Sequence, residues 1–133
     1  IYQSMRANHG EDPTQWPGHI DQPGSRPAKV FAVRPSEYVL PKSGQDAFTS
    51  SNIAFVLRNL GIERLIFIGG HTGACLGKTA KSAKAHGYAI VCIEDATNDA
   101  RASMRRPHIF NVGFDEVITT AEYLACVEEA CGA

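Results

Sequence analysis

Cys75 is the residue whose surroundings in this sequence point most directly to chemistry. It follows an apolar run, residues 65–68, which is typical of a buried strand, and two glycines then interrupt the pattern. A helical pattern rich in small residues and lysines runs from Thr72 to Gly87. The sequence therefore predicts strand, tight turn and helix, with Thr72 as the N-cap and Cys75 in the first helical turn.

A thiol at the start of a helix can act as a nucleophile. The first N–H groups of a helix have no intrahelical partner, and the positive end of the helix dipole lowers the pKa of a nearby thiol. The same N–H groups can stabilise an oxyanion. The alternative interpretation is that Cys75 is a small buried side chain against the sheet, and spacing alone does not decide between the two.

Lys42 is a second candidate, because it lies at the end of a short strand predicted over residues 37–41. Ligands of parallel sheets bind beyond the C-terminal ends of the strands, and Lys42 and Cys75 each follow such an end. An ammonium group beside a thiol favours the thiolate and can give a proton to a leaving amine. Without the thiol nearby, Lys42 would be an ordinary solvated charge.

Residues 77–79 read Gly-Lys-Thr, which is also the end of a phosphate-binding loop. Glu94 and Asp95 follow a predicted strand and could hold the magnesium ion of such a site. Thr72, however, replaces the first glycine of that motif, and the helix would have to begin near residue 77. A P-loop nucleotide-binding protein is therefore an alternative function from a different class.

The rest of the chain alternates between strand and helix patterns. This alternation predicts right-handed βαβ units and an α/β fold with a parallel sheet covered on both faces. A strand end is predicted at residues 1–5 and a long loop at residues 8–27. Further strands are predicted at 88–93 and 116–119, and helices at about 51–60 with Gly61 as the stop, at 100–110 interrupted by Pro107, and at 121–129.

Composition excludes several function classes. The 133 residues carry a net charge of -1 with 44% hydrophobic and 20% charged residues, which is typical of one soluble domain. Because no basic face is evident and no apolar run has membrane-spanning length, neither nucleic acid nor a membrane is predicted as a partner. The basic cluster 101–106 is expected to be solvated or paired. Three of the four cysteines lie in predicted core elements, which favours reduced thiols and a cytoplasmic location.

Several blocks of the sequence resemble one known family in order and spacing. They are the Lys-Ser-Gly-Gln-Asp-Ala-Phe block at 42–48, the block at 69–80 that contains Thr72 and Cys75, and Glu-Asp-Ala at 94–96. These residues resemble the isochorismatase-like cysteine hydrolases of the nicotinamidase/isochorismatase superfamily, and the resemblance runs from about residue 38 to the C-terminus. It implies a three-layer α/β/α Rossmann-like fold and a hydrolase of small amides, carbamoyl compounds or a vinyl ether.

The resemblance also implies roles for particular residues. Cys75 would be the nucleophile and Lys42 its charged partner. A cis peptide would join Gly70 to His71, and the backbone N–H groups of His71 and Cys75 would form the oxyanion hole. Residues 15–19 resemble the Trp-Pro-x-His segment of nicotinamidases, which implies that Trp16 lines the substrate pocket.

No cofactor is predicted. The Asp-x-His pair that belongs to the metal site of nicotinamidases is absent, although His9, Asp12 and His19 could bind a metal with a different geometry. The predicted partner is a small-molecule substrate. The family resemblance also implies that the protein assembles as a homo-oligomer.

The sequence departs from the family at the third catalytic residue, an aspartate in an Asp-x-Gln segment after the first strand. Asp12, Asp21 and Asp46 are not positional matches for it. We therefore expect a single isochorismatase-like domain over residues 1–133 that is N-terminally incomplete and lacks the family's first strand and helix. The predicted function is hydrolysis of a small amide or related C–N substrate through a Cys75 thioester. The alternative within the family is a catalytically inactive binding or oligomer-forming subunit.

Overall fold

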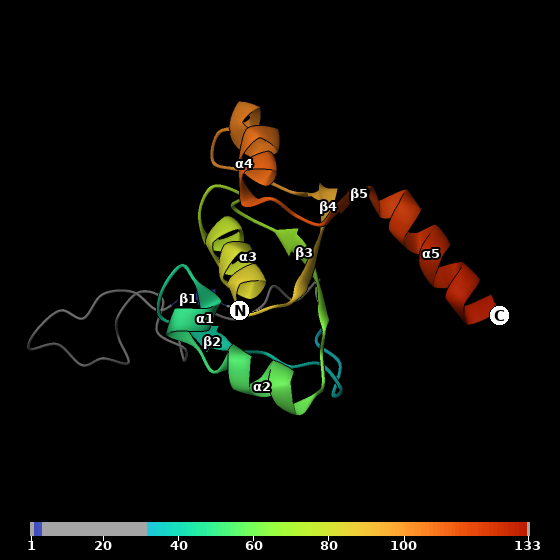
Figure 1. Ribbon diagram of the computed structural model, residues 1–133, viewed down its shortest axis with the longest axis horizontal. Coiled ribbons are helices and arrows are strands. Elements are labelled where there is room, and N and C mark those ends of the chain that lie inside the picture. The colour runs from blue at the N-terminus through green and yellow to red at the C-terminus, as the bar shows by residue number, and fades with distance from the viewer. Residues whose placement is uncertain (1, 4–31, 133) are drawn as a thin grey trace, which may run out of the picture.

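The computed structural model describes residues 2–3 and 32–132, in which strands and helices alternate as the sequence predicts (Figure 1). The elements are β1 (Tyr2–Gln3), β2 (Pro41–Lys42), α1 (Ala47–Ser50), α2 (Ile53–Asn59), β3 (Arg64–Gly69), α3 (Cys75–Ala85), β4 (Ala89–Thr97), the 3₁₀ turn η3 (Ala102–Met104), α4 (Arg105–Val112), β5 (Glu116–Ile118) and α5 (Thr120–Gly132).

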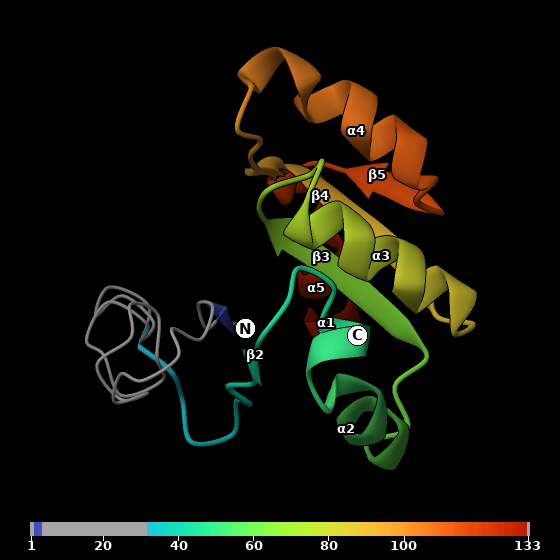
Figure 2. The same ribbon diagram turned by 90° about the vertical axis from the view of Figure 1, so that its left-hand side faces the viewer.

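The main sheet is parallel and has the order β3-β4-β5, with Ile66 opposite Val91 and Cys92 opposite Val117. Helices α3 and α4 cover one face, and α5 lies on the other side of the sheet (Figures 1 and 2). The predicted α/β fold, a parallel sheet with flanking helices, is therefore confirmed.

The core lies between β4 and the two helices of the covered face. Residues 90–93 of β4 are all buried, because this strand is central and its apolar run is unbroken. Ala80 and Ala83 of α3 are fully buried and pack with Ile90 and Val112. Their small side chains let α3 approach the sheet closely, which brings the first turn of this helix to the end of β3.

Strand β3 differs from the fully buried strand that the sequence predicts. Leu65 and Phe67 are partly buried and pack against the core, whereas Ile66 and Ile68 on the opposite face are 43% and 63% exposed. In the described part of the chain β3 pairs only with β4. The other edge of β3 and one of its faces are therefore open in this part of the chain.

Strands β1 and β2 form a second parallel pair, in which Gln3 is opposite Lys42. Within residues 2–3 and 32–132, no ladder joins this pair to the main sheet. The strand predicted at 37–41 is also shorter and shifted, because only Pro41 and Lys42 pair.

Several boundaries differ from the sequence predictions for local reasons. Ala74, rather than Thr72, is the N-cap of α3, because the Thr72 hydroxyl bonds elsewhere. Pro107 does not interrupt α4, since it lies in the first turn, where backbone N–H groups have no intrahelical acceptor. Strand β4 continues past Ile93 to Thr97, beyond the end of its apolar run.

Helix α5 has no buried residue. The prediction that Cys126 lies in a core element is therefore wrong, and Cys126 and Cys131 are both exposed. Among the described residues, every helix is too short or too polar to cross a membrane.

The close packing of α3 against the turn before it makes a testable prediction at Gly77. A Cβ atom at this position would lie 2.1 Å from the backbone oxygen of Thr72. We expect Gly77→Ala to lower the free energy of unfolding by about 1–3 kcal/mol in urea denaturation, although alanine normally favours a helix. Gly132→Ala, with no atom within 4 Å, is the matched control and should stabilise by at most about 1 kcal/mol. Equal effects at the two sites would contradict the close contact.

Candidate active site

Cys75 is the first residue of α3, directly beyond the turn that follows β3, and its side chain is half-buried. The His71 carbonyl accepts hydrogen bonds from the N–H groups of Ala74 at 3.0 Å and Leu76 at 3.1 Å. These two bonds close the turn immediately around Cys75. The predicted position of the cysteine in the first helical turn is therefore confirmed.

The peptide bond between Gly70 and His71 is cis, as the family resemblance implies. Within the described residues, no hydrogen bond uses the His71 N–H, whereas the next N–H, that of Thr72, donates to the Asn98 carbonyl at 3.0 Å. Among the residues that the structure describes, the His71 N–H therefore has no acceptor. The oxyanion role of His71 and Cys75 remains a prediction.

Lys42 is buried, with only 8% of its surface exposed, so it is not the solvated surface charge of the alternative interpretation. Its ammonium donates a hydrogen bond to the Gly44 carbonyl at 2.6 Å. No carboxylate among the described residues forms an ion pair with it. A buried cation without a carboxylate partner strongly favours an anion in its neighbourhood.

Lys42 and Cys75 line the same cavity, which has a volume of about 230 Å³. The cavity lies where β2 and β3 end, so the expectation that the two residues meet at the ends of parallel strands agrees with the structure. Their catalytic roles are not tested by this placement. The other lining residues are Phe67, Ile68, Gly70, Leu76 and Thr79.

Side chains of α3 hold the segment that follows Lys42. The Thr79 hydroxyl accepts a hydrogen bond from the buried Ala47 N–H at 3.1 Å. The Ser82 hydroxyl donates to Asp46 at 2.5 Å, and the other Asp46 oxygen accepts from the Phe48 N–H and caps α1. The helix that begins with Cys75 therefore also anchors the turn that positions Lys42.

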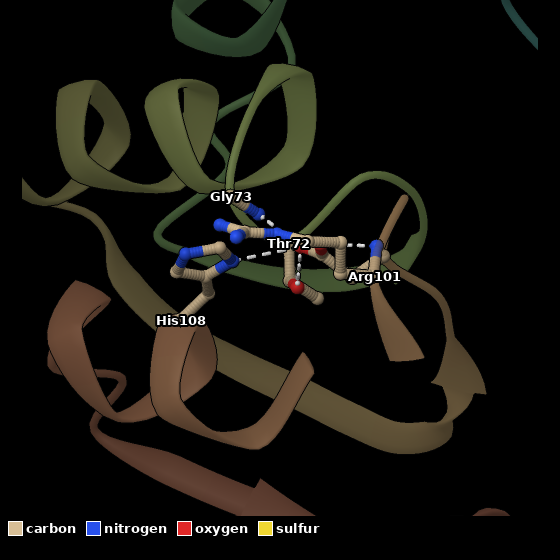
Figure 3. A network of polar contacts seen from close by, with 5 residues as sticks. Thr72, Gly73, Arg101 and His108 are labelled. Carbon is tan, nitrogen blue, oxygen red and sulfur yellow. Dashed lines mark hydrogen bonds and ion pairs between the residues drawn. The ribbon is translucent and has the colours of Figure 1, made fainter. Parts of the chain in front are cut away.

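Asp99 is the residue of this region that sequence reasoning missed. Its carboxylate accepts hydrogen bonds from the Thr72 hydroxyl, the Gly73 N–H and the Arg101 N–H, and it pairs with His108 (Figure 3). The bonds with His108 and Thr72 are the main causes that hold the pKa of Asp99 far below its usual range. The signal that could have found it is its place just beyond the end of β4, the strand beside β3.

The structure argues against the phosphate-loop alternative. Residues 77–79 lie inside α3, and the Lys78 N–H donates to the Ala74 carbonyl, so this segment is not a loop that can surround a phosphate. Asp95 accepts two hydrogen bonds from Thr120, and Glu94 pairs with Arg106 at 3.2 Å. The side chains of these two acids therefore bind Thr120 and Arg106 rather than the segment 77–79.

The four cysteines have different environments, and no disulfide joins them. Cys92 is completely buried, and this burial, together with the nearby charge of Glu94, raises its pKa to about 11. It is therefore a neutral thiol. Cys126 and Cys131 on α5 are exposed to solvent, so accessibility alone would make these two the most reactive.

Several residues that the sequence offers as site residues lie outside the described residues: Trp16, His9, Asp12 and His19. Their proposed roles therefore stay predictions. In the part of the chain that the structure describes, no group of three or more histidines, cysteines and acids could hold a metal ion.

Comparison with known proteins identifies the family of this chain. The sequence profile of the isochorismatase domain matches residues 3–122. The chain belongs to the isochorismatase family.

Relatives and solved structures agree with this assignment. The ureidoacrylate amidohydrolase RutB of Rhizobium rhizogenes is 30% identical over 100 residues, which are 73% of this chain and 41% of that protein. N-carbamoylsarcosine amidase from Thermoplasma acidophilum superposes with a TM-score of 0.66 at 26% identity, over 72% of this chain and 56% of that one. An isochorismatase family protein from Desulfovibrio vulgaris gives 0.71 at 25% identity, over 80% and 57%. This isochorismatase-family chain thus spans less than two thirds of each of these proteins.

The contact between α3 and the Lys42 turn predicts the effect of Thr79→Val. Valine keeps the shape of threonine but leaves the buried Ala47 N–H without its acceptor, so the free energy of unfolding should fall by about 1–3 kcal/mol in urea. Thr79→Ser keeps the hydroxyl and should lose at most about 1 kcal/mol for the missing methyl group. A serine variant as unstable as the valine variant would show that the hydroxyl contributes little.

The low pKa of Asp99 predicts a pH dependence of stability. A carboxyl group with a lowered pKa in the folded state stabilises the fold above its unfolded pKa of about 3.9, and this contribution is lost as the pH falls further. The difference in unfolding free energy between wild type and Asp99→Asn should therefore be largest near neutral pH and shrink below about pH 4. Urea titrations at several pH values measure it, and a difference independent of pH would contradict the assignment.

Proposed function

We propose that this isochorismatase-family protein is a cysteine hydrolase that acts on a small amide or related C–N substrate through a thioester on Cys75. The observation that carries the proposal is the shared cavity: the thiol at the first residue of α3 and the buried ammonium of Lys42 line one space of about 230 Å³. This volume suits a compact substrate with few atoms.

In the proposed reaction, the Cys75 thiolate attacks the carbonyl carbon and a C–S bond forms. The buried Lys42 ammonium provides the positive charge that stabilises the thiolate, and the helix N-terminus adds to it. The carbonyl oxygen becomes an oxyanion, which the N–H groups of His71 and Cys75 stabilise. The absence of any other hydrogen bond to the His71 N–H in the described residues supports its part in this role.

The C–N bond then breaks, and Lys42 gives a proton to the departing nitrogen. An ammonium group has three N–H donors, and among the described residues only the Gly44 carbonyl accepts from Lys42, which supports the proposal that the other donors serve the substrate. Water then attacks the thioester carbonyl and gives a proton back to Lys42. The C–S bond breaks, which releases the acid and restores the Cys75 thiolate. No step in this sequence uses a metal or an organic cofactor.

The substrate class rests on the relatives. Two of them carry the names ureidoacrylate amidohydrolase and N-carbamoylsarcosine amidase, and both names describe cleavage of an amide-type C–N bond. We extend this class, small amides and carbamoyl compounds, to the present chain. Trp16 is proposed to line the substrate pocket.

The proposal also covers the context of the reaction. We place the protein in the cytoplasm, because its four cysteines form no disulfide. We also propose a single domain over residues 1–133 that assembles as a homo-oligomer, since α5 carries exposed apolar side chains such as Leu124 and Val127. The partner in catalysis is a small molecule, not nucleic acid.

Limited alkylation tests the state of the nucleophile. With substoichiometric iodoacetamide, Cys75 should be labelled first in peptide mass spectrometry, ahead of the more exposed Cys126 and Cys131, because the proposed mechanism makes it the nucleophile. Lys42→Met should slow the labelling of Cys75 alone, at least about tenfold, since one buried charge is removed. Lys84→Met is the matched control, because Lys84 is a half-exposed lysine that pairs with Asp115 at 3.4 Å.

Hydrolysis is measured in parallel by ammonia release from a panel of small amides and carbamoyl compounds, where Cys75→Ser should abolish turnover. Labelling of Cys75 at the same rate as the α5 cysteines, unaffected by Lys42→Met, would sink the proposal. That result would favour the inactive, subunit-forming alternative.

A further inference from the structure

Asp99 joins two loops that come from neighbouring strands. The loop after β4 contains Asn98, whose N–H donates to the Gly69 carbonyl and whose carbonyl accepts from the Thr72 N–H, both at 3.0 Å. Asp99 adds its side chain to this backbone connection, because one carboxylate oxygen accepts from the Thr72 hydroxyl at 2.7 Å and from the Gly73 N–H at 2.8 Å. The loop after β4 therefore holds the segment between the end of β3 and Cys75 with main-chain and side-chain hydrogen bonds.

The residues that Asp99 binds, Thr72 and Gly73, lie between the two backbone N–H groups that the proposed reaction uses. His71 precedes Thr72, and the turn closed by the His71 carbonyl leads directly into Cys75. Anchoring Thr72 and Gly73 thus restricts the orientation of both peptide units. Misplacement of a catalytic donor by about 1 Å can cost a hundredfold in rate.

His108 of α4 also contacts the Asp99 carboxylate. Its Nδ1 lies 2.8 Å from the carboxylate oxygen that also bonds Thr72 and Gly73, and the side chain of Asp99 is only 5% exposed. The imidazole also packs on the loop itself, because a Cβ atom at Gly73 would lie 2.3 Å from His108 Nδ1. Helix α4 therefore supports the loop through Asp99 and through direct contact (Figure 3).

The Asp99–His108 pair does not reach the reacting atoms. Neither residue is among those that line the cavity of Lys42 and Cys75. His108 instead lines a separate, smaller cavity with Thr72, Gly73 and residues of α3 and α4. The pair therefore acts through the loop and not as an acid or base on the substrate.

We propose that Asp99 is a positioning residue, which with His108 holds the segment 71–73 so that the His71 and Cys75 N–H groups are oriented toward a developing oxyanion. This inference rests on the proposed function, because it needs Cys75 to attack a carbonyl group. It predicts that loss of Asp99 impairs reactions that form an oxyanion and spares reactions of the same sulfur that do not.

Two reagents separate these cases on the intact protein without any need for the natural substrate. Iodoacetamide is attacked at its CH₂ carbon, where a C–S bond forms and iodide leaves, so no charge develops on oxygen. p-Nitrophenyl acetate is attacked at its carbonyl carbon, passes through an oxyanion, and leaves a thioester on Cys75 as p-nitrophenolate departs. The ratio of the two rate constants measures the oxyanion hole.

The experiment uses Cys126→Ser/Cys131→Ser protein, so that Cys75 and the buried Cys92 are the only thiols. We expect Asp99→Ala to lower the rate constant for acylation by about tenfold to a hundredfold and to leave alkylation within about twofold. Asp95→Ala is the matched control, since Asp95 also follows the apolar run of β4 and accepts two hydrogen bonds, but from Thr120 rather than the loop. It should change neither rate.

Variants at Thr72 keep the test decisive if Asp99→Ala does not fold. Thr72→Val removes one donor to Asp99 and should lower acylation selectively, whereas Thr72→Ser keeps the hydroxyl and should restore the wild-type ratio. Equal loss of both reactions in the Asp99 and Thr72 variants, or loss of neither, would overturn the positioning role. If iodoacetamide does not label Cys75 ahead of Cys126 and Cys131 in the wild-type protein, the proposed function fails instead. The two failures are thereby distinguished.

Discussion

The candidate site depends on the contacts that the first two turns of α3 make with two separate loops. The N-terminal end of the helix carries Cys75 and closes the turn around the His71 carbonyl. Thr79 and Ser82, one and two turns further along, hold the segment that follows Lys42. The helix itself is fixed on the sheet by small buried residues such as Ala80 and Ala83. One short helix therefore determines where the sulfur and the ammonium lie.

Charge and burial give this arrangement its chemical character. The buried ammonium of Lys42 donates to a neutral carbonyl and retains most of its attraction for an anion, because no carboxylate among the described residues pairs with it. The buried Cys92 has the opposite environment, in which desolvation and Glu94 raise the pKa of the thiol and keep it neutral. Burial thus favours an anionic partner for Lys42 and a neutral thiol at Cys92.

The sequence was sufficient to predict what depends on local pattern. The apolar run before two glycines located Cys75 at the helix start, and the order of strands and helices implied that Lys42 and Cys75 lie near each other at strand ends. Contacts between residues that are far apart in the sequence were not predictable. Asp99 was missed because the apolar run of β4 ends at Ile93 while the strand continues to Thr97. The expectation that Thr72 caps α3 failed because its hydroxyl bonds Asp99, a partner far away in sequence.

The separation of the two sheets has a consequence for what sets the distance between Lys42 and Cys75. In the described residues, no ladder joins β2, which carries Lys42, to β3, which leads to Cys75. Strand pairing permits displacements only in whole-residue steps, and a single step reverses the faces of a strand. Contacts across the surface of a helix allow fractional adjustments instead. Within the described residues, the separation of ammonium and sulfur therefore depends on hydrogen-bonding side chains of α3, Thr79 and Ser82, rather than on strand register.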